Sequence, residues 1–386
     1  MAKFPASVAR FVAQNRQPKE ADKSFFRRVL SLKKLSDDFL DIVFQNPRDN
    51  RATFKAMMSL FKTPAEKLRF MNEYNAVYQR YFDRVWKRAQ TVEDVVKLRP
   101  NFTPWALEDK FGDFTLGSVP EDFGTSSDFG ALVQSICHSS AMTNYKHIKR
   151  LEGHPKELME TYPAFKKIDF WNLGQRKRVL SQILTRKCGR PFRIKIKDKT
   201  FHAQFLCNPF SHKTVFLITT SEGKKYILKT LPYHFAKVSS DRARKEHENI
   251  ALRGDSIYAD ALLEFYLKLN QCPHAPLICF YNFKQEVALY EVAKSTPCVL
   301  KNKKADIRAM YDFNVKRIPD ANALGVYIND VVADNFVQTA QGIKIIDIGH
   351  ATFYAPMTPD KPGLTYHLGN LCGKDFFSLF AENGLL

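Results

Sequence analysis

The chain has 386 residues, a hydrophobic content of 45% and a formal net charge of +19. The hydrophobic content excludes an intrinsically disordered chain, and at about 150 residues per domain the length fits two domains or one large two-lobed domain. The excess of 59 Lys and Arg over 40 Asp and Glu predicts a polyanionic partner, which is a nucleic acid, an anionic membrane or a phosphorylated small molecule.

The cysteine pattern and the N-terminal sequence indicate the cellular compartment of the protein. Seven cysteines are an odd number, and no C-x-x-C pair occurs, so we expect neither a disulfide framework nor a zinc site. This pattern favours a reducing, cytosolic compartment. Arg10 and Arg16 interrupt the first apolar stretches, and no later run reaches ~18 apolar residues, the length that spans a bilayer. We therefore expect no Sec signal and no membrane span.

The first half of the chain has the periodicity of helices. Thr63–Glu66 reads Thr-Pro-Ala-Glu, a capping box with proline at the first helical position, and predicts a helix to about Gln90. Ser36 and Thr91 each precede acidic residues and predict two further helix starts. Residues 100–130 are rich in Gly, Pro, Asp and Phe, which predicts irregular structure.

A two-residue alternation of apolar and polar side chains begins near residue 190 and indicates strands. The predicted strands cover residues 192–199, 214–219, 225–231, 277–281 and 287–290. A turn at Ser221–Gly223 joins two of them into a small antiparallel sheet, and residues 239–270 have helical composition. A helix between two groups of strands is the typical order of elements in a lobe that binds a nucleotide.

Two acidic motifs occur in the last third of the chain. Asp330 lies five residues before Asn335, and Asp347 begins an Asp-Ile-Gly that follows an apolar strand twelve residues beyond that asparagine. Here the chain resembles the protein kinase superfamily, whose catalytic loop has the spacing D-x-x-x-x-N and whose metal-binding motif is D-F-G. By the same resemblance, Lys229 in Tyr-Ile-Leu-Lys is similar to the strand lysine of V-A-I-K. Glu291 and Val292 resemble the hinge that contacts the nucleotide.

The resemblance implies a role for each of these side chains. Phosphoryl transfer needs a cation on the phosphates, a divalent metal, and a carboxylate that receives the proton of the acceptor hydroxyl. Lys229 is expected to contact ATP, Asn335 and Asp347 to hold Mg²⁺ or Mn²⁺, and Asp330 to receive the proton. Taken singly, each residue is more often part of an ordinary turn or surface strand, so the prediction rests on their joint order.

Other positions of the predicted site are less regular. Glu264 is expected to pair with the strand lysine, with Glu246 or Glu248 as alternatives. The hairpin that should cover the phosphates lacks the G-x-G-x-x-G motif, so we expect phosphate contacts from Ser211, backbone N–H groups or Lys213.

The chain also departs from the kinase pattern elsewhere. Ile328–Asn329 replaces the usual His-Arg, Ile348 replaces the Phe of the metal motif, and no A-P-E motif follows. Two literal Asp-Phe-Gly triplets, Asp122–Gly124 and Asp128–Gly130, precede the predicted lysine and follow no apolar strand. We therefore reject both triplets as the metal motif.

Basic side chains are concentrated in residues 171–200, which contain ten of them and a single acid. Like charges at this density repel one another, and a bound polyphosphate would relieve that repulsion, although a solvated face is the commoner explanation. The predicted ligands of such a polyphosphate are Arg176, Lys177, Arg178, Arg186, Lys187, Arg190, Arg193 and Lys195.

Together, a divergent kinase core, a helical N-terminal half and strong basicity resemble a Legionella effector kinase of the type that host inositol hexakisphosphate activates. This resemblance implies a Ser/Thr protein kinase that autophosphorylates and that uses ATP with Mg²⁺ or Mn²⁺. It also implies secretion without a Sec signal into the host cytosol, with inositol hexakisphosphate as activator, and we expect this activator to bind the basic block of residues 171–200. Anionic membrane lipid is a further expected partner because of the net charge of +19.

The predicted fold class is α+β, in an atypical bilobal protein-kinase-like arrangement. A helical region covers residues 1–190, a kinase-like N-lobe 191–290, and a reduced C-lobe 291–386. Two alternatives remain: a lipid or small-molecule kinase of the same fold, and a non-catalytic module that binds inositol phosphates or anionic lipid. Nucleic acid is the weakest partner because few aromatic side chains are interspersed in the basic block.

Overall fold

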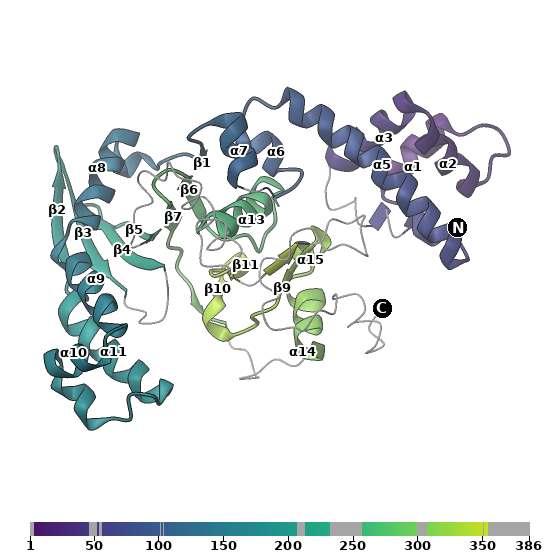
Figure 1. The fold of residues 1–386 in the computed structure, drawn as a ribbon. Helices are drawn as coiled ribbons and strands as arrows, with labels where there is room; N and C mark the ends of the chain where they lie inside the picture. Colours follow the sequence, from purple (N-terminus) through teal and green to yellow (C-terminus); the bar gives the residue numbers. More distant parts are fainter. Residues whose placement is uncertain are drawn as a thin grey trace. The chain divides into compact units, whose positions relative to one another are not determined.

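The computed structural model describes residues 4–45, 52–53, 56–100, 102, 104–206, 213–231, 257–298, 307–349 and 351–353. These residues form a mixed α+β structure with antiparallel sheets, which confirms the predicted class at this level (Figure 1). The chain divides into two compact units. Unit 1 comprises Met1–Phe111, Leu262–Pro276 and Ser295–Leu386, and unit 2 comprises Gly112–Ala261 and Leu277–Lys294.

Helices form the N-terminal part of unit 1. They are α1 (Ala6–Asn15), α2 (Asp22–Ser31), α3 (Lys33–Gln45), α5 (Pro64–Arg88), α6 (Val92–Val96) and α7 (Pro104–Phe111). The predicted capping box at Thr63 and the predicted helix start at Thr91 are confirmed, since Thr63 and Thr91 accept the backbone N–H groups of Glu66 and Asp94. The predicted start at Ser36 is wrong, because α3 begins at Lys33 and the Ser36 hydroxyl donates to the Lys33 carbonyl inside the helix.

The C-terminal part of unit 1 consists of short elements. They are β8 (Thr296–Pro297), α14 (Ile307–Asp312), the π-helical turn η3 (Phe313–Arg317), α15 (Pro319–Ala323), β9 (Val326–Ile328), the 3₁₀ turn η4 (Ala333–Asn335), β10 (Phe336–Thr339), β11 (Gly342–Ile345) and β12 (Ala351–Phe353). Strands β11, β10 and β8 form one small sheet and β12 pairs with β9, all antiparallel.

Unit 2 is built on a seven-stranded antiparallel sheet with the order β1-β6-β7-β5-β4-β3-β2. Its strands are β1 (Thr115–Gly117), β2 (Phe192–Ile196), β3 (Lys199–Phe205), β4 (Thr214–Thr220), β5 (Lys225–Thr230), β6 (Ile278–Asn282) and β7 (Val287–Glu291). All five predicted strands occur, but the first ends at Ile196 and not at residue 199, because a turn at Lys197 leads into β3. The turn before β5 contains Gly223 at a φ of 84°, a conformation that glycine adopts without strain.

Helices cover one face of this sheet. They are α8 (Ser126–Cys137), α9 (Ser140–Glu152), α10 (Pro155–Thr161) and α11 (Leu173–Cys188), with the 3₁₀ turns η1 (Glu121–Phe123) and η2 (Pro163–Lys167). Their apolar side chains share one core with alternate residues of the strands, such as Phe216 and Leu228. Helix α13 (Ile257–Leu269) crosses the boundary between the units. The prediction that residues 100–130 are irregular is wrong, because α7, β1, η1 and the start of α8 lie there.

Both literal Asp-Phe-Gly triplets have structural roles in unit 2. Asp122 accepts hydrogen bonds from the Tyr226 hydroxyl and, at 2.9 Å, from Lys224 Nζ. These bonds lower the pKa of the Asp122 carboxyl. In the second triplet, Asp128 caps α8 by bonding Thr125 and forms an ion pair with Lys197 at 2.7 Å. The two motifs therefore attach the segment before α8 to the strands.

The bonds of Asp128 also make the folding stability of unit 2 depend on pH in the acid range. Hydrogen bonds from Lys197 and from the Thr125 backbone lower the pKa of the Asp128 carboxyl from 3.8 to about 2. Because the folded pKa lies below the unfolded one, this stabilisation is present above about pH 4 and is lost as the pH falls toward 2. We expect the melting temperature of Asp128→Asn to fall less steeply than that of the wild type as the pH is lowered through this range. The exposed control Asp198→Asn should leave the wild-type slope unchanged, and equal slopes in the two variants would contradict this assignment.

Candidate functional site

Asp330 and Asn335 lie together in the loop after β9. The buried Asn314 holds the preceding strand, since its Oδ1 accepts the N–H of Ile328 at 2.7 Å and its Nδ2 donates to the Ile328 carbonyl at 2.9 Å. Asn335 Nδ2 then donates to the backbone carbonyl of Asp330 at 3.0 Å and to its Oδ2 at 3.1 Å. The two residues of the D-x-x-x-x-N motif are thus joined side chain to side chain.

Asp347 lies beside this pair because of the β10–β11 hairpin. The hairpin pairs Phe336 with Ile345, so the residues on either side of it meet. The Asn335 carbonyl accepts the N–H of Ile346 at 2.9 Å and that of Asp347 at 3.5 Å. Asp347 Oδ1 in turn accepts the N–H of Gly349 at 3.0 Å. Unit 1 therefore brings together Asp330, Asn335 and the loop that carries Asp347.

This arrangement offers oxygen atoms to a hard cation. Because Asn335 donates through Nδ2, its Oδ1 is the atom of the amide that can act as a ligand, and Asp347 adds a carboxylate. Mg²⁺ prefers oxygen ligands and is often bound by one or two carboxylates, waters and substrate phosphates. No group of three His, Cys, Asp or Glu side chains suited to a metal occurs in the part of the chain that the structure describes. A cation here would need ligands besides these side chains, such as water molecules.

Lys229 lies on β5, on the sheet face opposite to the helices of unit 2. It stands opposite Val215 in the register of β4 and β5, and its Nζ lies 4.7 Å from the ring centroid of Tyr290. Leu217 and Ile227 are also paired on this face and are half-buried. A cation therefore lies next to an aliphatic surface that a flat aromatic ring could cover.

Helix α13 begins on the same side of the sheet as Lys229. Within unit 2, Asp260 of α13 forms an ion pair with Lys213, which precedes β4 by one residue and alternates with Val215 on that face. Glu264 is fully buried and follows Asp260 by one turn on one stripe of the helix. Lys213 is therefore engaged with Asp260, whereas a phosphate contact was predicted for it. Three other sequence-predicted positions lie outside the described residues: Ser211, Glu246 and Glu248.

The predicted hinge residues use their backbone donors within the sheet of unit 2. The N–H of Glu291 donates to the Leu277 carbonyl at 2.9 Å, and the N–H of Val292 donates to the Lys225 carbonyl at 3.1 Å. Both side chains are exposed. A nucleotide at this segment would have to use other atoms as its hydrogen-bond donors.

The structure divides the predicted inositol-phosphate ligands into two groups. Ile194 points into the core that α11 covers, so Arg193 and Lys195 project from the other face of β2. Five of the remaining ligands belong to α11: Arg176, Lys177, Arg178, Arg186 and Lys187. Arg190 lies in the connection from α11 to β2, and the Arg176 guanidinium lies 5.5 Å from the Phe170 ring centroid. The basic block therefore does not form one site.

Arg193 belongs to a polar row that crosses four strands. It stands opposite His202 of β3, which is opposite Thr219 of β4, which is opposite Lys225 of β5. Lys195 lies two residues along β2 on the same face, about 7 Å away. The sheet face opposite to α11 therefore carries a group of basic side chains of its own, separate from those of α11.

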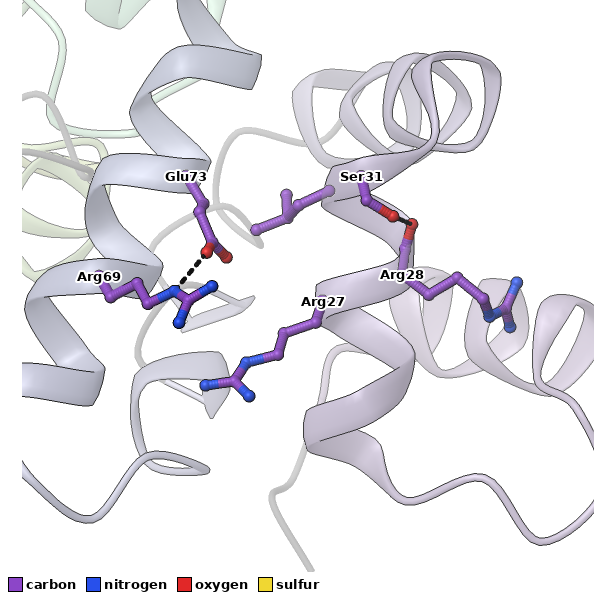
Figure 2. A pocket seen from close by; sticks show the side chains of 6 residues that line it. Arg27, Arg28, Ser31, Arg69 and Glu73 are labelled. Carbon is purple, nitrogen blue, oxygen red and sulfur yellow. Dashed lines mark hydrogen bonds and ion pairs between the residues drawn. The ribbon is translucent and has the colours of Figure 1, made fainter.

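A pocket of about 490 Å³ lies between α2 and α5 in unit 1 (Figure 2). Its lining residues are Arg27, Arg28, Leu30, Ser31, Arg69 and Glu73. Arg69 pairs with Glu73 at 3.0 Å, as the dashed line in Figure 2 shows. Arg28 points away and pairs with Glu20 at 2.7 Å. None of the sequence-predicted site residues lines this pocket.

Sequence reasoning missed two residues that support the site: Asn314 and Asp260. Asp260 had a usable signal, because it precedes Glu264 by four residues and so lies on the same helix stripe. Asn314 had none, since its partner Ile328 is 14 residues away in the chain.

Among the described residues, no helix combines the length and apolar character that a bilayer crossing requires. No protein-family model, curated protein or solved structure matches this chain.

Proposed function

We propose that this chain is an ATP-dependent protein kinase of the divergent bacterial effector type, which transfers phosphate to Ser or Thr and to itself. The observation that carries the proposal is the hydrogen-bonded pair of Asp330 and Asn335 beside the Asp347 loop. This geometry provides a carboxylate for the acceptor proton next to two oxygen ligands for a cation.

In this proposal each residue performs one task. Asp330 orients the acceptor hydroxyl and accepts its proton, while Asn335 and Asp347 hold Mg²⁺ or Mn²⁺. The metal neutralises the charge that develops on the transferred phosphate. Lys229 neutralises the other phosphates, and the aliphatic surface beside it packs against the adenine ring.

The order of elements supports the kinase-like part of the proposal. Counting from β3, Lys229 lies on the third strand, and α13 with Glu264 is the next described helix, which is the order of the strand lysine and its helical partner in protein kinases. The proposed N-lobe is the sheet of unit 2, and the proposed reduced C-lobe follows β7. Ile328–Asn329 and Ile348 differ from the usual kinase motifs, and for this reason we propose a divergent kinase.

The proposal includes a regulatory ligand and a location. Inositol hexakisphosphate would activate the kinase by binding the exposed sheet face at Arg193 and Lys195, with His202 beside them. Two arginine or lysine side chains about 7 Å apart suit adjacent phosphates on one small ring. The protein would reach the host cytosol by secretion without a Sec signal and meet its activator there.

The test of the proposed activity uses the full chain with γ-labelled ATP, Mg²⁺ or Mn²⁺ and a generic basic acceptor, with and without inositol hexakisphosphate. We expect transfer in the wild type and a loss of at least about 100-fold in Lys229→Met, because the phosphates lose their cation. Lys225→Met, on the same strand and face, is the matched control and should transfer phosphate from ATP to the acceptor like the wild type. Absence of transfer from folded wild type in every condition would overturn the kinase proposal.

The activator site has its own matched pair of variants. We expect Arg193→Ala with Lys195→Ala to weaken inositol hexakisphosphate binding at least about tenfold, because two charged contacts are removed. Arg186→Ala with Lys187→Ala, on α11, should bind like the wild type in isothermal titration calorimetry. The reverse result would move the site to α11.

A further inference from the structure

An exposed apolar tip lies between η2 and α11 in unit 2. Trp171 is 80% exposed and Leu173 is 55% exposed, whereas the neighbouring Phe170 is only 4% exposed. We call Trp171 and Leu173 the Trp171 tip. Trp is normally well buried in soluble proteins, so a tip that exposes Trp beside Leu points to a partner that covers it.

Hydrogen bonds hold the Trp171 tip in this exposed position. The N–H of Trp171 donates to Asp169 Oδ1 at 3.0 Å, and the N–H of Asp169 donates to Gln175 Oε1 at 3.1 Å. Phe170 occupies the buried site instead, with its ring 5.7 Å from that of Trp171 and the Arg176 guanidinium on it. The loop therefore presents Trp171 outward through its own bonding.

Basic residues flank the Trp171 tip on both sides along the chain. Residues 163–178 contain five basic side chains and one acid, which is Asp169. The basic side chains are Lys166, Lys167, Arg176, Lys177 and Arg178. Because Asp169 already accepts the Trp171 N–H, it is directed toward the loop backbone. The segment is thus apolar at its centre and basic on both sides along the chain.

We propose that the Trp171 tip docks on an anionic membrane surface. The amphipathic indole ring and the Leu side chain enter the headgroup region, while the flanking lysines and arginines contact lipid phosphates. Two side chains are too small a patch for a stable protein complex, which buries about 800 Å² on each partner. Base stacking would not use Leu173. The proposal does not depend on the kinase activity.

The experiment measures binding of the full chain to vesicles of phosphatidylcholine, with and without phosphatidylserine, by cosedimentation. We expect binding that needs phosphatidylserine and decreases with salt. Trp171→Ala should weaken it at least about tenfold, and Lys166→Glu with Lys167→Glu by a similar factor. The difference between the emission spectra of the wild type and Trp171→Phe should shift to the blue on binding, since the ring leaves water.

A second cation-flanked leucine provides matched controls. Leu32 is 50% exposed and is followed by Lys33 and Lys34. Leu32→Ala, and Lys33→Glu with Lys34→Glu, should bind vesicles like the wild type, whereas Leu173→Ala should bind more weakly. Equal losses at both places would show that net charge alone drives binding. Equal losses, no vesicle binding by the wild type, or no blue shift would overturn the proposal.

Discussion

We expect Asp347→Asn to lower phosphate transfer from ATP by at least about a thousandfold. The substitution keeps the shape of the side chain and the acceptor oxygen for the Gly349 N–H, which bonds Asp347 Oδ1 at 3.0 Å. It removes the negative charge that would hold the cation. The rate is measured with γ-labelled ATP at saturating Mg²⁺ or Mn²⁺, and the melting temperature of the variant is compared with that of the wild type.

Two controls separate this effect from a general loss of aspartate. Asp334 is exposed in the same loop as Asn335, so Asp334→Asn should transfer phosphate like the wild type. Asp122 belongs to a literal Asp-Phe-Gly but bonds Tyr226, so Asp122→Asn should lower stability and leave transfer per folded molecule unchanged. Loss of transfer in Asp122→Asn with retention in Asp347→Asn would refute the assignment of the metal motif.

The largest expected effect on stability is that of Phe123→Ala, at about 3–5 kcal/mol. Phe123 is 1% exposed, its ring stacks on that of Phe201 with centroids 5.5 Å apart, and the rings of Phe129 and Tyr226 meet it edge to face. Truncation would leave a cavity that three rigid aromatic rings cannot fill. The free energy of unfolding is measured by urea denaturation.

The control for this prediction is Trp171→Ala, which should change the free energy of unfolding by less than about 0.5 kcal/mol, because the ring is 80% exposed. Since two compact units need not unfold together, hydrogen exchange of the β3 and β5 amides should follow unit 2 separately. If Phe123→Ala leaves these amides as protected as in the wild type, the segment before α8 does not anchor the sheet.

Sequence periodicity predicted the strands of unit 2 well, because burial on one face imposes an alternation that is visible locally. It missed β3, although Phe201, Ala203 and Phe205 alternate there with polar residues. Capping was right at Thr63 and wrong at Ser36. A serine before two aspartates is as compatible with a helix interior as with a start, and packing of α3 decided between them.

The residues of the candidate site were identified by their spacing, but their arrangement was not. A five-residue interval permits a bond between Asp330 and Asn335, whereas the contact of Asn335 with the Asp347 loop depends on the β10–β11 hairpin. The basic block shows the limit most clearly. Its charges are adjacent in sequence, and the burial of Ile194 places Arg193 on the sheet face opposite to α11.

The sequence by itself determined the α+β class, the positions of the confirmed strands and capped helices, and the spacing of Asp330, Asn335 and Asp347. Each of these depends on side chains within a few turns or one strand of each other. The tertiary structure alone decided that Lys213 pairs with Asp260, that the Asp-Phe-Gly triplets attach α8 to the strands, and that Trp171 is exposed while Phe170 is buried. These outcomes depend on which distant segments compete for one buried surface, and that competition is settled only when the whole chain packs.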